Sequence, residues 1–353
     1  MRPSSRLTLC GGRARARLRA LCISVRSPQP THIVTETKYS IVVPVFNEAE
    51  SLPELYRRMC AVMDGLDGTC ELILVNDGSQ DGTPQLLRAL QAADARVRVL
   101  EFSRNFGHQM AITAGLDYAG GSAVVIIDAD LQDPPEAIPQ LVAEWQRGAQ
   151  VVFAVRAKRL GESWLKRSTA AAFYRIINRL TELHIPLDSG DFRLLDRQVV
   201  LALREVREHH RFMRGLSVWL GFRQASVQYV RQERFAGVSK YPMRKMMRFA
   251  ADGITSFSYV PLQLATTLGF IAASMALLGI PAVLLLRLSG YYAFEGQATT
   301  LSSVLLLGGV QLIFLGIIGE YLGRIYNEVK KRPLYILSAQ LGFTDSRRDI
   351  PKP

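Results

Sequence analysis

Short apolar runs alternate with segments of helical periodicity from Tyr39 onward. Apolar residues recur at helical spacing between the runs, as at Leu52, Leu55 and Met59. Strands that are apolar throughout and alternate with helices predict an α/β fold whose mostly parallel sheet is covered on both faces. Five runs have the length and the β-branched content of strands: Tyr39–Phe46, Glu71–Val75, Val97–Phe102, Ala123–Ile127 and Val151–Val155.

Polar residues follow three of these predicted strands. Asn47 and Glu48 follow the first strand, Asp77 the second, and Asp128 and Asp130 the fourth. Sheets of this kind bind ligands beyond the carboxyl ends of their strands. We therefore expect these side chains to meet in one ligand cleft.

The C-terminal third has a different pattern. Leu262–Leu286 is 25 residues long and Gly296–Gly319 is 24 residues long, and neither contains a charge. Each exceeds the roughly 20 residues that cross a bilayer core. We predict a two-span transmembrane hairpin over residues 260–325, preceded by an amphipathic juxtamembrane helix over 242–259 and followed by a cytoplasmic tail over 326–353. A pair of buried soluble helices is the alternative.

Basic residues flank the hairpin on both outer sides. Arg244, Lys245 and Arg248 precede the first span, whereas Arg324 and the basic group 330–332 follow the second. The positive-inside rule therefore predicts a multi-pass protein whose α/β domain is cytoplasmic.

The net charge of +12 indicates an anionic partner: nucleic acid, phospholipid or a phosphorylated substrate. Residues 1–35 hold seven Arg and no acidic residue, so they carry seven of these twelve charges. Their apolar runs are too short for a secretory signal. We interpret residues 1–38 as a disordered leader outside the fold, with a transit peptide or a membrane-touching tail as alternatives. No nucleic-acid motif is present, so we expect no nucleic-acid partner.

The pair Asp128 and Asp130 is the sharpest chemical signal. Two carboxylates at a strand end are hard oxygen ligands, which suit Mg²⁺ or Mn²⁺ bound together with substrate phosphates. The chain has neither a GxxxxGK[ST] loop nor a GxGxxG loop, so side chains must hold any nucleotide. Asp77 and Glu48 are placed to accept hydrogen bonds from a base or ribose. The alternative is that Asp77 and the residues after it form only a turn and the start of a helix, without binding a nucleotide.

Several longer motifs occur in a specific order. They are VPVFNE (Val43–Glu48), VNDGSQDGT (Val75–Thr83), FSRNFGHQMAITAGLDYA (Phe102–Ala119), DADLQDPPE (Asp128–Glu136), SGDFRLLDR (Ser189–Arg197) and ERFAGVSKY (Glu233–Tyr241). Together they resemble the inverting glycosyltransferases of family 2, in the branch of dolichyl-phosphate mannose synthases and bacterial polyprenyl-phosphate sugar transferases. The stretch Gly319–Leu337 resembles the bacterial, GtrB-like subgroup. The resemblance covers residues 39–337.

The resemblance implies a GT-A catalytic domain over residues 39–241 that uses Mg²⁺ or Mn²⁺. It implies transfer of a sugar from a nucleotide diphosphate, which we expect to be UDP-linked, to a polyprenyl phosphate, which we expect to be undecaprenyl phosphate. It also implies a bacterial inner-membrane protein in contact with membrane lipids, and a homo-oligomer such as a tetramer. The identity of the sugar stays open.

The resemblance also assigns site residues. The nucleotide pocket would be lined by Pro44, Asn47, Glu48, Asp77 and Asp128. The metal and diphosphate would be held by Asp128, Asp130 and Gln132. The phosphates would be surrounded by Arg156, Arg167, Arg234, Ser239 and Lys240.

Asp191 matches the carboxylate that serves as catalytic base in the family. An acceptor phosphate monoester has a second pKa of about 6, so it is already a nucleophile at neutral pH and needs little help from a base. We therefore expect Asp191 to be a positioning or proton-accepting group, with a helix cap or a salt bridge to Arg193 as the alternative. Four histidines show no metal-ligand spacing, and we expect a surface or core role for each of them, namely His108, His184, His209 and His210.

Three other functions are compatible with parts of the sequence. A processive polysaccharide synthase of the same family would carry a QxxRW motif and more spans, and this chain has neither. An inactive membrane partner protein is disfavoured because Asp128, Asp130 and Asp191 are all present. A nucleic-acid binder is disfavoured because more than half of the excess charge lies in the leader.

Overall fold

The computed structural model describes residues 37–156, 189–230 and 297–343, with scattered positions between 262 and 289. All of them belong to the compact unit Glu36–Pro353; the chain's other unit is Met1–Thr35. Residues 1–36 of the predicted leader and the whole predicted juxtamembrane helix lie outside the described residues.

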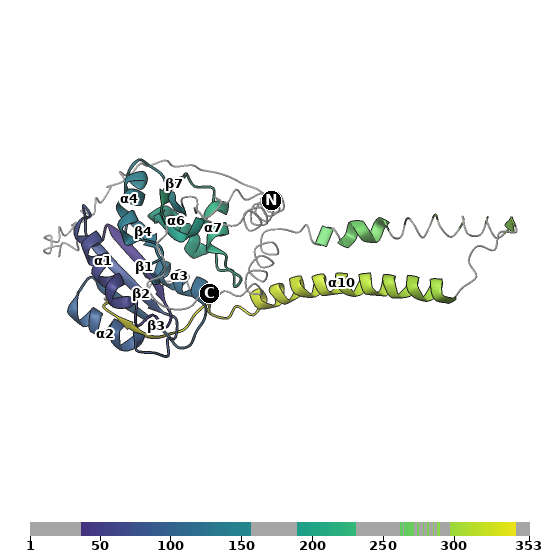
Figure 1. The fold of residues 1–353 in the computed structure, drawn as a ribbon, viewed down its shortest axis with the longest axis horizontal. Helices are drawn as coiled ribbons and strands as arrows, with labels where there is room; N and C mark the ends of the chain where they lie inside the picture. The colour runs from purple at the N-terminus through teal and green to yellow at the C-terminus, as the bar shows by residue number, and fades with distance from the viewer. Residues whose placement is uncertain are drawn as a thin grey trace, which may run out of the picture. The chain divides into compact units, whose positions relative to one another are not determined.

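Eight strands form one sheet in the order β7-β5-β6-β4-β1-β2-β3-β8 (Figure 1). The central strands β4, β1, β2 and β3 are parallel, and β7 is parallel to β5. β6 is antiparallel to both of its neighbours, and β8 is antiparallel to β3. The bounds are β1 (Tyr39–Val45), β2 (Cys70–Asn76), β3 (Val97–Phe102), β4 (Ala123–Ile126), β5 (Val151–Arg156), β6 (Ser189–Asp196), β7 (Gln224–Tyr229) and β8 (Leu337–Leu341). The prediction of an α/β fold with a mostly parallel sheet is confirmed.

Helices cover both faces of this sheet (Figure 1). In β1, Ile41 and Val43 belong to one apolar cluster and Val42 to the other, as the two-residue period of a strand requires. The first cluster includes residues of α1, α2 and α4, and the second includes residues of α3, α6 and α7. The helices in the described residues are α1 (Leu52–Asp64), α2 (Thr83–Ala93), α3 (His108–Tyr118), the 3-10 turn η1 (Pro135–Ala137), α4 (Ile138–Gln146), α6 (Arg197–Glu205), α7 (Met213–Trp219) and α10 (Gln297–Val329).

A strand from the predicted C-terminal tail completes the sheet. β8 pairs with β3, and just before it Tyr335 stacks on Phe102 with ring centroids 5.3 Å apart. The Tyr335 hydroxyl also donates to Asp117 Oδ2 at 2.8 Å. The sheet of the catalytic domain therefore extends beyond the predicted boundary at residue 241, because an unpaired edge of β3 accepts the returning chain.

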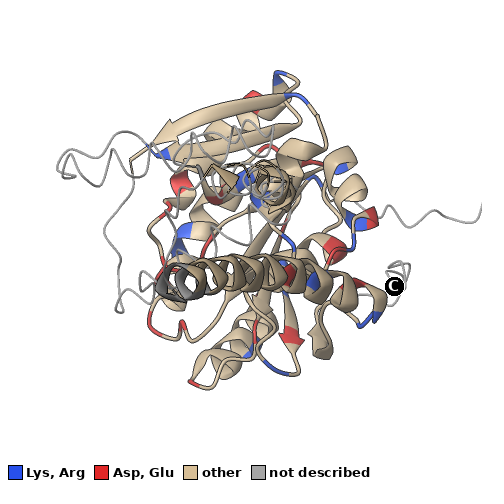
Figure 2. Ribbon diagram, turned by 90° about the vertical axis from the view of Figure 1, so that its right-hand side faces the viewer, with Lys and Arg blue, Asp and Glu red and all other residues tan. Residues whose placement is uncertain are grey.

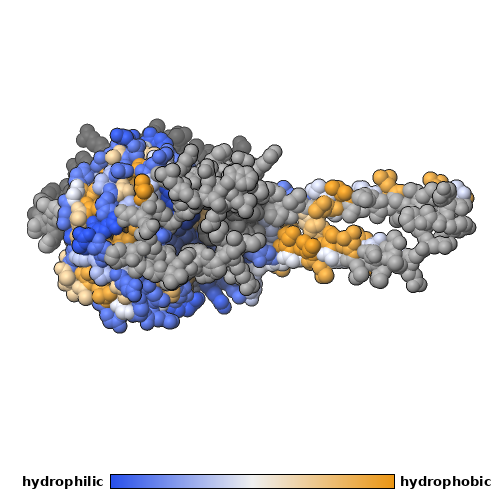
Figure 3. Space-filling model, viewed as in Figure 1, coloured by the Kyte–Doolittle hydropathy of each residue, from blue (hydrophilic) through white to orange (hydrophobic). Residues whose placement is uncertain are grey.

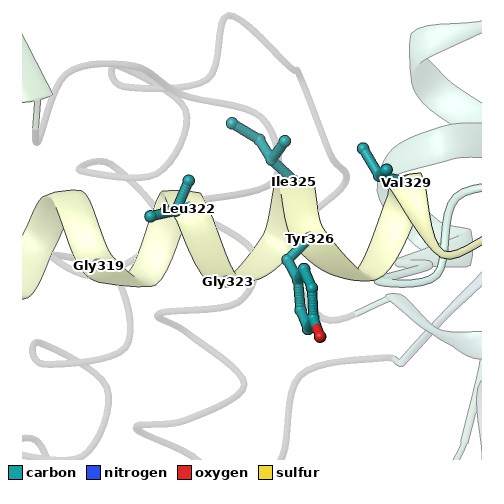
Figure 4. Close-up of a pocket in the computed structure, with 6 residues that line it drawn as sticks. All are labelled: Gly319, Leu322, Gly323, Ile325, Tyr326 and Val329. Carbon is teal, nitrogen blue, oxygen red and sulfur yellow. The ribbon is translucent and has the colours of Figure 1, made fainter.

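One helix in the described part of the chain is long and apolar enough to cross a membrane, the segment Leu306–Val329 of α10. Its large apolar side chains are exposed, and Figure 3 shows them as a hydrophobic band. The first predicted span lies mostly outside the described residues, so the hairpin stays a prediction. An apolar hollow on α10 is lined by residues of that helix alone, and it contains none of the predicted site residues (Figure 4).

Helix α3 approaches β1 unusually closely at Gly115. A Cβ atom built on Gly115 would lie 2.1 Å from Val42 Cγ1, well inside van der Waals contact. Val42 is fully buried and β-branched, so it has no free space or easy rotation by which to move away. The absence of a side chain at Gly115 therefore sets the distance between α3 and the sheet.

Gly115→Ala is expected to destabilise the protein. Alanine favours a helix by about 1 kcal/mol over glycine, but overpacking a close contact costs about 1–3 kcal/mol. Since the clash here involves a rigid strand, we expect a lower melting temperature in detergent. Gly65→Ala is the control, because its new Cβ would be 3.6 Å from the nearest atoms. An unchanged melting temperature for Gly115→Ala would contradict the close packing.

Candidate active site

The loops after β1 and β2 are tied together by side-chain bonds. Asn47 has a positive φ of 54°. Its backbone N–H donates to Ser79 Oγ at 3.0 Å, and its side-chain Oδ1 accepts from the Gln80 N–H at 2.8 Å. The Glu48 N–H donates to Thr83 Oγ1 at 3.0 Å. The predicted nucleotide residues Asn47 and Glu48 thus lie at the carboxyl edge of the sheet, beside the segment that follows Asp77.

Asp77 holds the start of helix α3. Its carboxylate is 3% exposed and accepts hydrogen bonds from the backbone N–H groups of Phe106 at 2.7 Å and Gly107 at 3.0 Å. Burial raises the pKa of Asp77, and these two donors partly offset that rise. Gly107 has φ of 102°, which glycine adopts readily. Asp77 therefore positions His108, the residue after Gly107. The predicted contact of Asp77 with a nucleotide stays a prediction.

His108 lies between two acidic side chains from different strands. Its Nε2 is 3.4 Å from Asp128 Oδ1, beyond the end of β4, and 3.5 Å from Asp191 Oδ2 on β6. Burial alone would lower the pKa of His108, but the two carboxylates raise it to about 9. We expected only a surface or core role for His108, but α3 begins at the edge of the sheet and brings its ring into contact with both carboxylates.

Asp191 is held by two arginines. Arg214 on α7 donates to both of its oxygens, Nε to Oδ1 at 3.0 Å and Nη2 to Oδ2 at 2.9 Å. Arg193 Nη2 donates to Oδ1 at 3.2 Å, which is the salt bridge considered as an alternative. Burial would raise the pKa of Asp191, but Arg214 and His108 hold it well below its usual range. A carboxylate with so low a pKa is a weak proton acceptor.

Arg193 fixes helix α7 against strand β6. Its guanidinium is buried and donates to Ser217 Oγ at 2.7 Å and to the Gly190 carbonyl at 3.0 Å. At the start of α7 the Met213 N–H donates to Gln109 Oε1 at 3.0 Å. These bonds place Arg214 beside Asp191. No local pattern in the sequence singled out Arg214, since it occurs in a short, ordinary helix.

The other predicted residues differ in how far the structure describes them. Pro44 lies in β1, two residues after Val42. Val42 is the last residue of β1 that pairs with β4. Arg156 ends β5 and its Nε donates to the Tyr229 hydroxyl at 3.3 Å. Charged residues mark many helices and strands of the catalytic unit, whereas most of α10 has none (Figure 2). Four predicted phosphate-site residues lie outside the described residues, namely Arg167, Arg234, Ser239 and Lys240.

Comparison with known proteins identifies the family. The model of "Glycosyl transferase family 2" matches residues 40–204. An uncharacterized glycosyltransferase, YkcC of Bacillus subtilis (strain 168), is 48% identical over 310 residues, which are 88% of this chain and 96% of the relative. The chain belongs to glycosyltransferase family 2. The predicted resemblance is confirmed, and the protein is a glycosyltransferase with a GT-A fold.

Other relatives have more specific names. The bactoprenol glucosyl transferase of Shigella phage SfII is 44% identical over 300 residues, which cover 85% of this glycosyltransferase and 97% of the relative. Among solved structures, glucosyl-3-phosphoglycerate synthase from Mycobacterium tuberculosis has a TM-score of 0.46 at 21% identity, covering 62% of this chain and 77% of that chain.

The loop after β4 suits a divalent cation shared with a ligand. Asp128 Oδ1 is buried and has no hydrogen-bond partner among the described residues. Burial raises the pKa of Asp128 to about 6, although His108 opposes the rise. Asp130 Oδ1 accepts from the Gln132 N–H at 3.1 Å, which orders the loop. No group of three or more His, Cys, Asp or Glu in the described residues is arranged to hold a metal ion, so substrate phosphates would have to complete the coordination.

Arg214→Lys is expected to slow sugar transfer by this glycosyltransferase. Lysine keeps the charge but loses the two-pronged contact with Asp191. Hydrogen bonds to charged groups contribute about 1.5–3 kcal/mol, so we expect a loss of about 10–100-fold in rate.

The matched control is Arg57→Lys. Arg57 makes the same two-pronged contact with Glu54, but on the protein surface. We expect its rate to stay within about twofold of wild type, since exposed ion pairs contribute little. Equal rates for Arg214→Lys and wild type would show that Asp191 does not need this contact.

Proposed function

We propose that this glycosyltransferase transfers a sugar from a nucleotide diphosphate sugar to a polyprenyl phosphate, with inversion at the anomeric carbon. The observation that carries the proposal is the row of alternating charges Asp128, His108, Asp191 and Arg214 at the carboxyl edge of the sheet. Relatives named bactoprenol glucosyl transferases, 42–44% identical over nearly their whole length, support a polyprenyl phosphate as the acceptor.

The donor would bind across the ends of β1, β2 and β4. Asn47 and Glu48 follow β1, Asp77 follows β2, and Asp128 follows β4, which pairs with β1; Pro44 lies in β1 just before them. A Mg²⁺ or Mn²⁺ ion bound by Asp128 and Asp130, with Gln132 beside it, would offset the negative charge that develops on the diphosphate leaving group. The protein's own contribution is to hold these carboxylates in a fixed loop.

The acceptor phosphate supplies its own nucleophile. A phosphate monoester has a second pKa of about 6 and is mostly dianionic at neutral pH. Its oxygen forms a bond to the anomeric carbon as the bond from that carbon to the diphosphate oxygen breaks, and the nucleoside diphosphate leaves. No proton has to move, which agrees with the low pKa of Asp191. We assign Asp191 the role of a fixed anion that positions His108 and Arg214, whose positive charges face the reacting phosphates.

Helix α10 would keep the enzyme at the membrane, where the lipid acceptor is found. Its segment Leu306–Val329 is long enough to span a bilayer, and the first predicted span would complete a hairpin with both ends in the cytoplasm. This arrangement corresponds to a multi-pass protein of the bacterial inner membrane. Arg156, together with Arg167, Arg234, Ser239 and Lys240, would then surround the phosphates.

A panel of nucleotide sugars tests the reaction. We expect the purified, detergent-solubilised protein to convert undecaprenyl phosphate to a lipid heavier by one sugar when a UDP-sugar is supplied, with UDP-glucose tested first because of the relatives' names. Mass spectrometry of the lipid fraction detects the product. Release of free sugar without any glycosylated lipid, for every donor offered, would contradict the proposed acceptor.

Removal of the cation tests the role of the loop after β4. Transfer should stop in EDTA and return with Mg²⁺ or Mn²⁺. Asp130→Asn should lower the rate by at least about 100-fold, as loss of a key electrostatic group in an active site does. Asp64→Asn, on the exposed end of α1, is the control. Near-normal transfer by Asp130→Asn in Mg²⁺ would exclude Asp130 as a ligand.

A further inference from the structure

Tyr229 lies at a junction that the sequence did not reveal. It is the last residue of β7 and is 6% exposed. Its hydroxyl donates a hydrogen bond to Asp133 Oδ1 and accepts one from Arg156 Nε at 3.3 Å. The ring packs edge-on against Phe192, with centroids 5.7 Å apart. One side chain thus touches three separate segments of the catalytic domain.

Each of these segments carries a proposed functional group. Asp133 ends the loop that begins with Asp128 and Asp130. Arg156 is the register partner of Tyr229 across the β5–β7 pair. Phe192 is the neighbour of Asp191 on β6. The position of Tyr229 therefore affects the loop after β4, Arg156 and the strand of Asp191 at the same time.

The contacts of Asp133 fix the position of its carboxylate. Asp133 is 2% exposed, and a buried carboxylate requires hydrogen-bond donors or positive charge nearby. The Arg156 guanidinium lies 4.0 Å from its Oδ1. Gly190 leaves space for the Arg156 guanidinium, since a Cβ atom at Gly190 would lie 3.1 Å from Arg156 Nη2 and 3.7 Å from Asp133 Oδ2.

The loop between Asp128 and Asp133 has an unusual backbone conformation. Leu131 has a positive φ of 58°, an uncommon conformation for a residue other than glycine. Such a conformation persists only where the surrounding structure imposes it. β4 anchors the loop at one end, and Asp133, bound by Tyr229, anchors it at the other.

We propose that Tyr229 is a positioning residue for the cation-binding loop, which it fixes through Asp133 at a set place relative to Arg156. The inference rests on the proposed function, because it concerns the cation that Asp128 and Asp130 would hold. Tyr229 would not touch the cation or the substrates. Its hydroxyl would act by keeping the carboxylates of the loop arranged for binding before the donor arrives.

Tyr229→Phe tests this role, because it removes one hydroxyl and keeps the ring that contacts Phe192. The measurement is the dissociation constant of Mn²⁺ for the full-length protein in detergent with UDP present, followed by electron paramagnetic resonance. Loss of a group that orients metal ligands weakens binding by about 10–100-fold, and we expect a change in that range. Tyr56→Phe is the matched control, because the Tyr56 hydroxyl donates to Asp94 Oδ2 at 3.0 Å and makes none of these contacts; its Mn²⁺ affinity should be unchanged.

The outcomes separate this inference from the proposed function. A wild-type protein that does not bind Mn²⁺ with UDP, or an Asp130→Asn variant that binds it equally well, overturns the cation assignment and this inference with it. Wild-type binding that Tyr229→Phe leaves unchanged, even with a lower melting temperature, overturns this inference alone. If Tyr229→Phe does not fold, Asp133→Ala replaces it, since alanine removes the acceptor of the Tyr229 hydroxyl. We expect weaker Mn²⁺ binding there too, and unchanged binding overturns the inference.

Discussion

The catalytic end of this glycosyltransferase depends on the contact of His108 with two carboxylates. Asp128 and Asp191 would repel each other in a partly buried site, where charge interactions are much stronger than in water. The His108 ring lies within 3.5 Å of both, and Arg214 binds both oxygens of Asp191. The alternation of charge allows two acidic strand ends to meet without either having to be neutralised by protonation.

The scaffold around this contact is arranged to keep it in place. Asp77 binds the backbone just before His108, and Gly115 lets α3 lie directly on β1. Arg193 ties α7 to β6 from within the protein, so that Arg214 reaches Asp191 from a fixed helix. Polar groups in these positions are buried and paired, and such pairing fixes their geometry. Removing one partner strongly destabilises the protein, because the other partner is left buried and unpaired.

The C-terminal segments belong to the same structural unit as the site. After α10, the chain returns to the sheet and adds β8 beside β3. His209, four residues before α7, contacts α10: its backbone N–H donates to Glu328 Oε1 at 2.7 Å. The apolar helix and the catalytic sheet are therefore joined by strand pairing and by polar contacts near α7, and not by chain connectivity alone.

The sequence by itself determined the family, the first five strands with the helices between them, and the polar residues that follow three of these strands. These features depend on local periodicity and on contiguous motifs, such as Asp128–Glu136, which can be recognised without knowing the fold. Tertiary structure alone decided the roles of His108, Arg214 and Tyr229. Each acts through a partner 20 to 100 residues away in sequence, as Tyr229 does through Asp133. The pairing of such partners follows from strand order and helix packing, which no short stretch of sequence encodes.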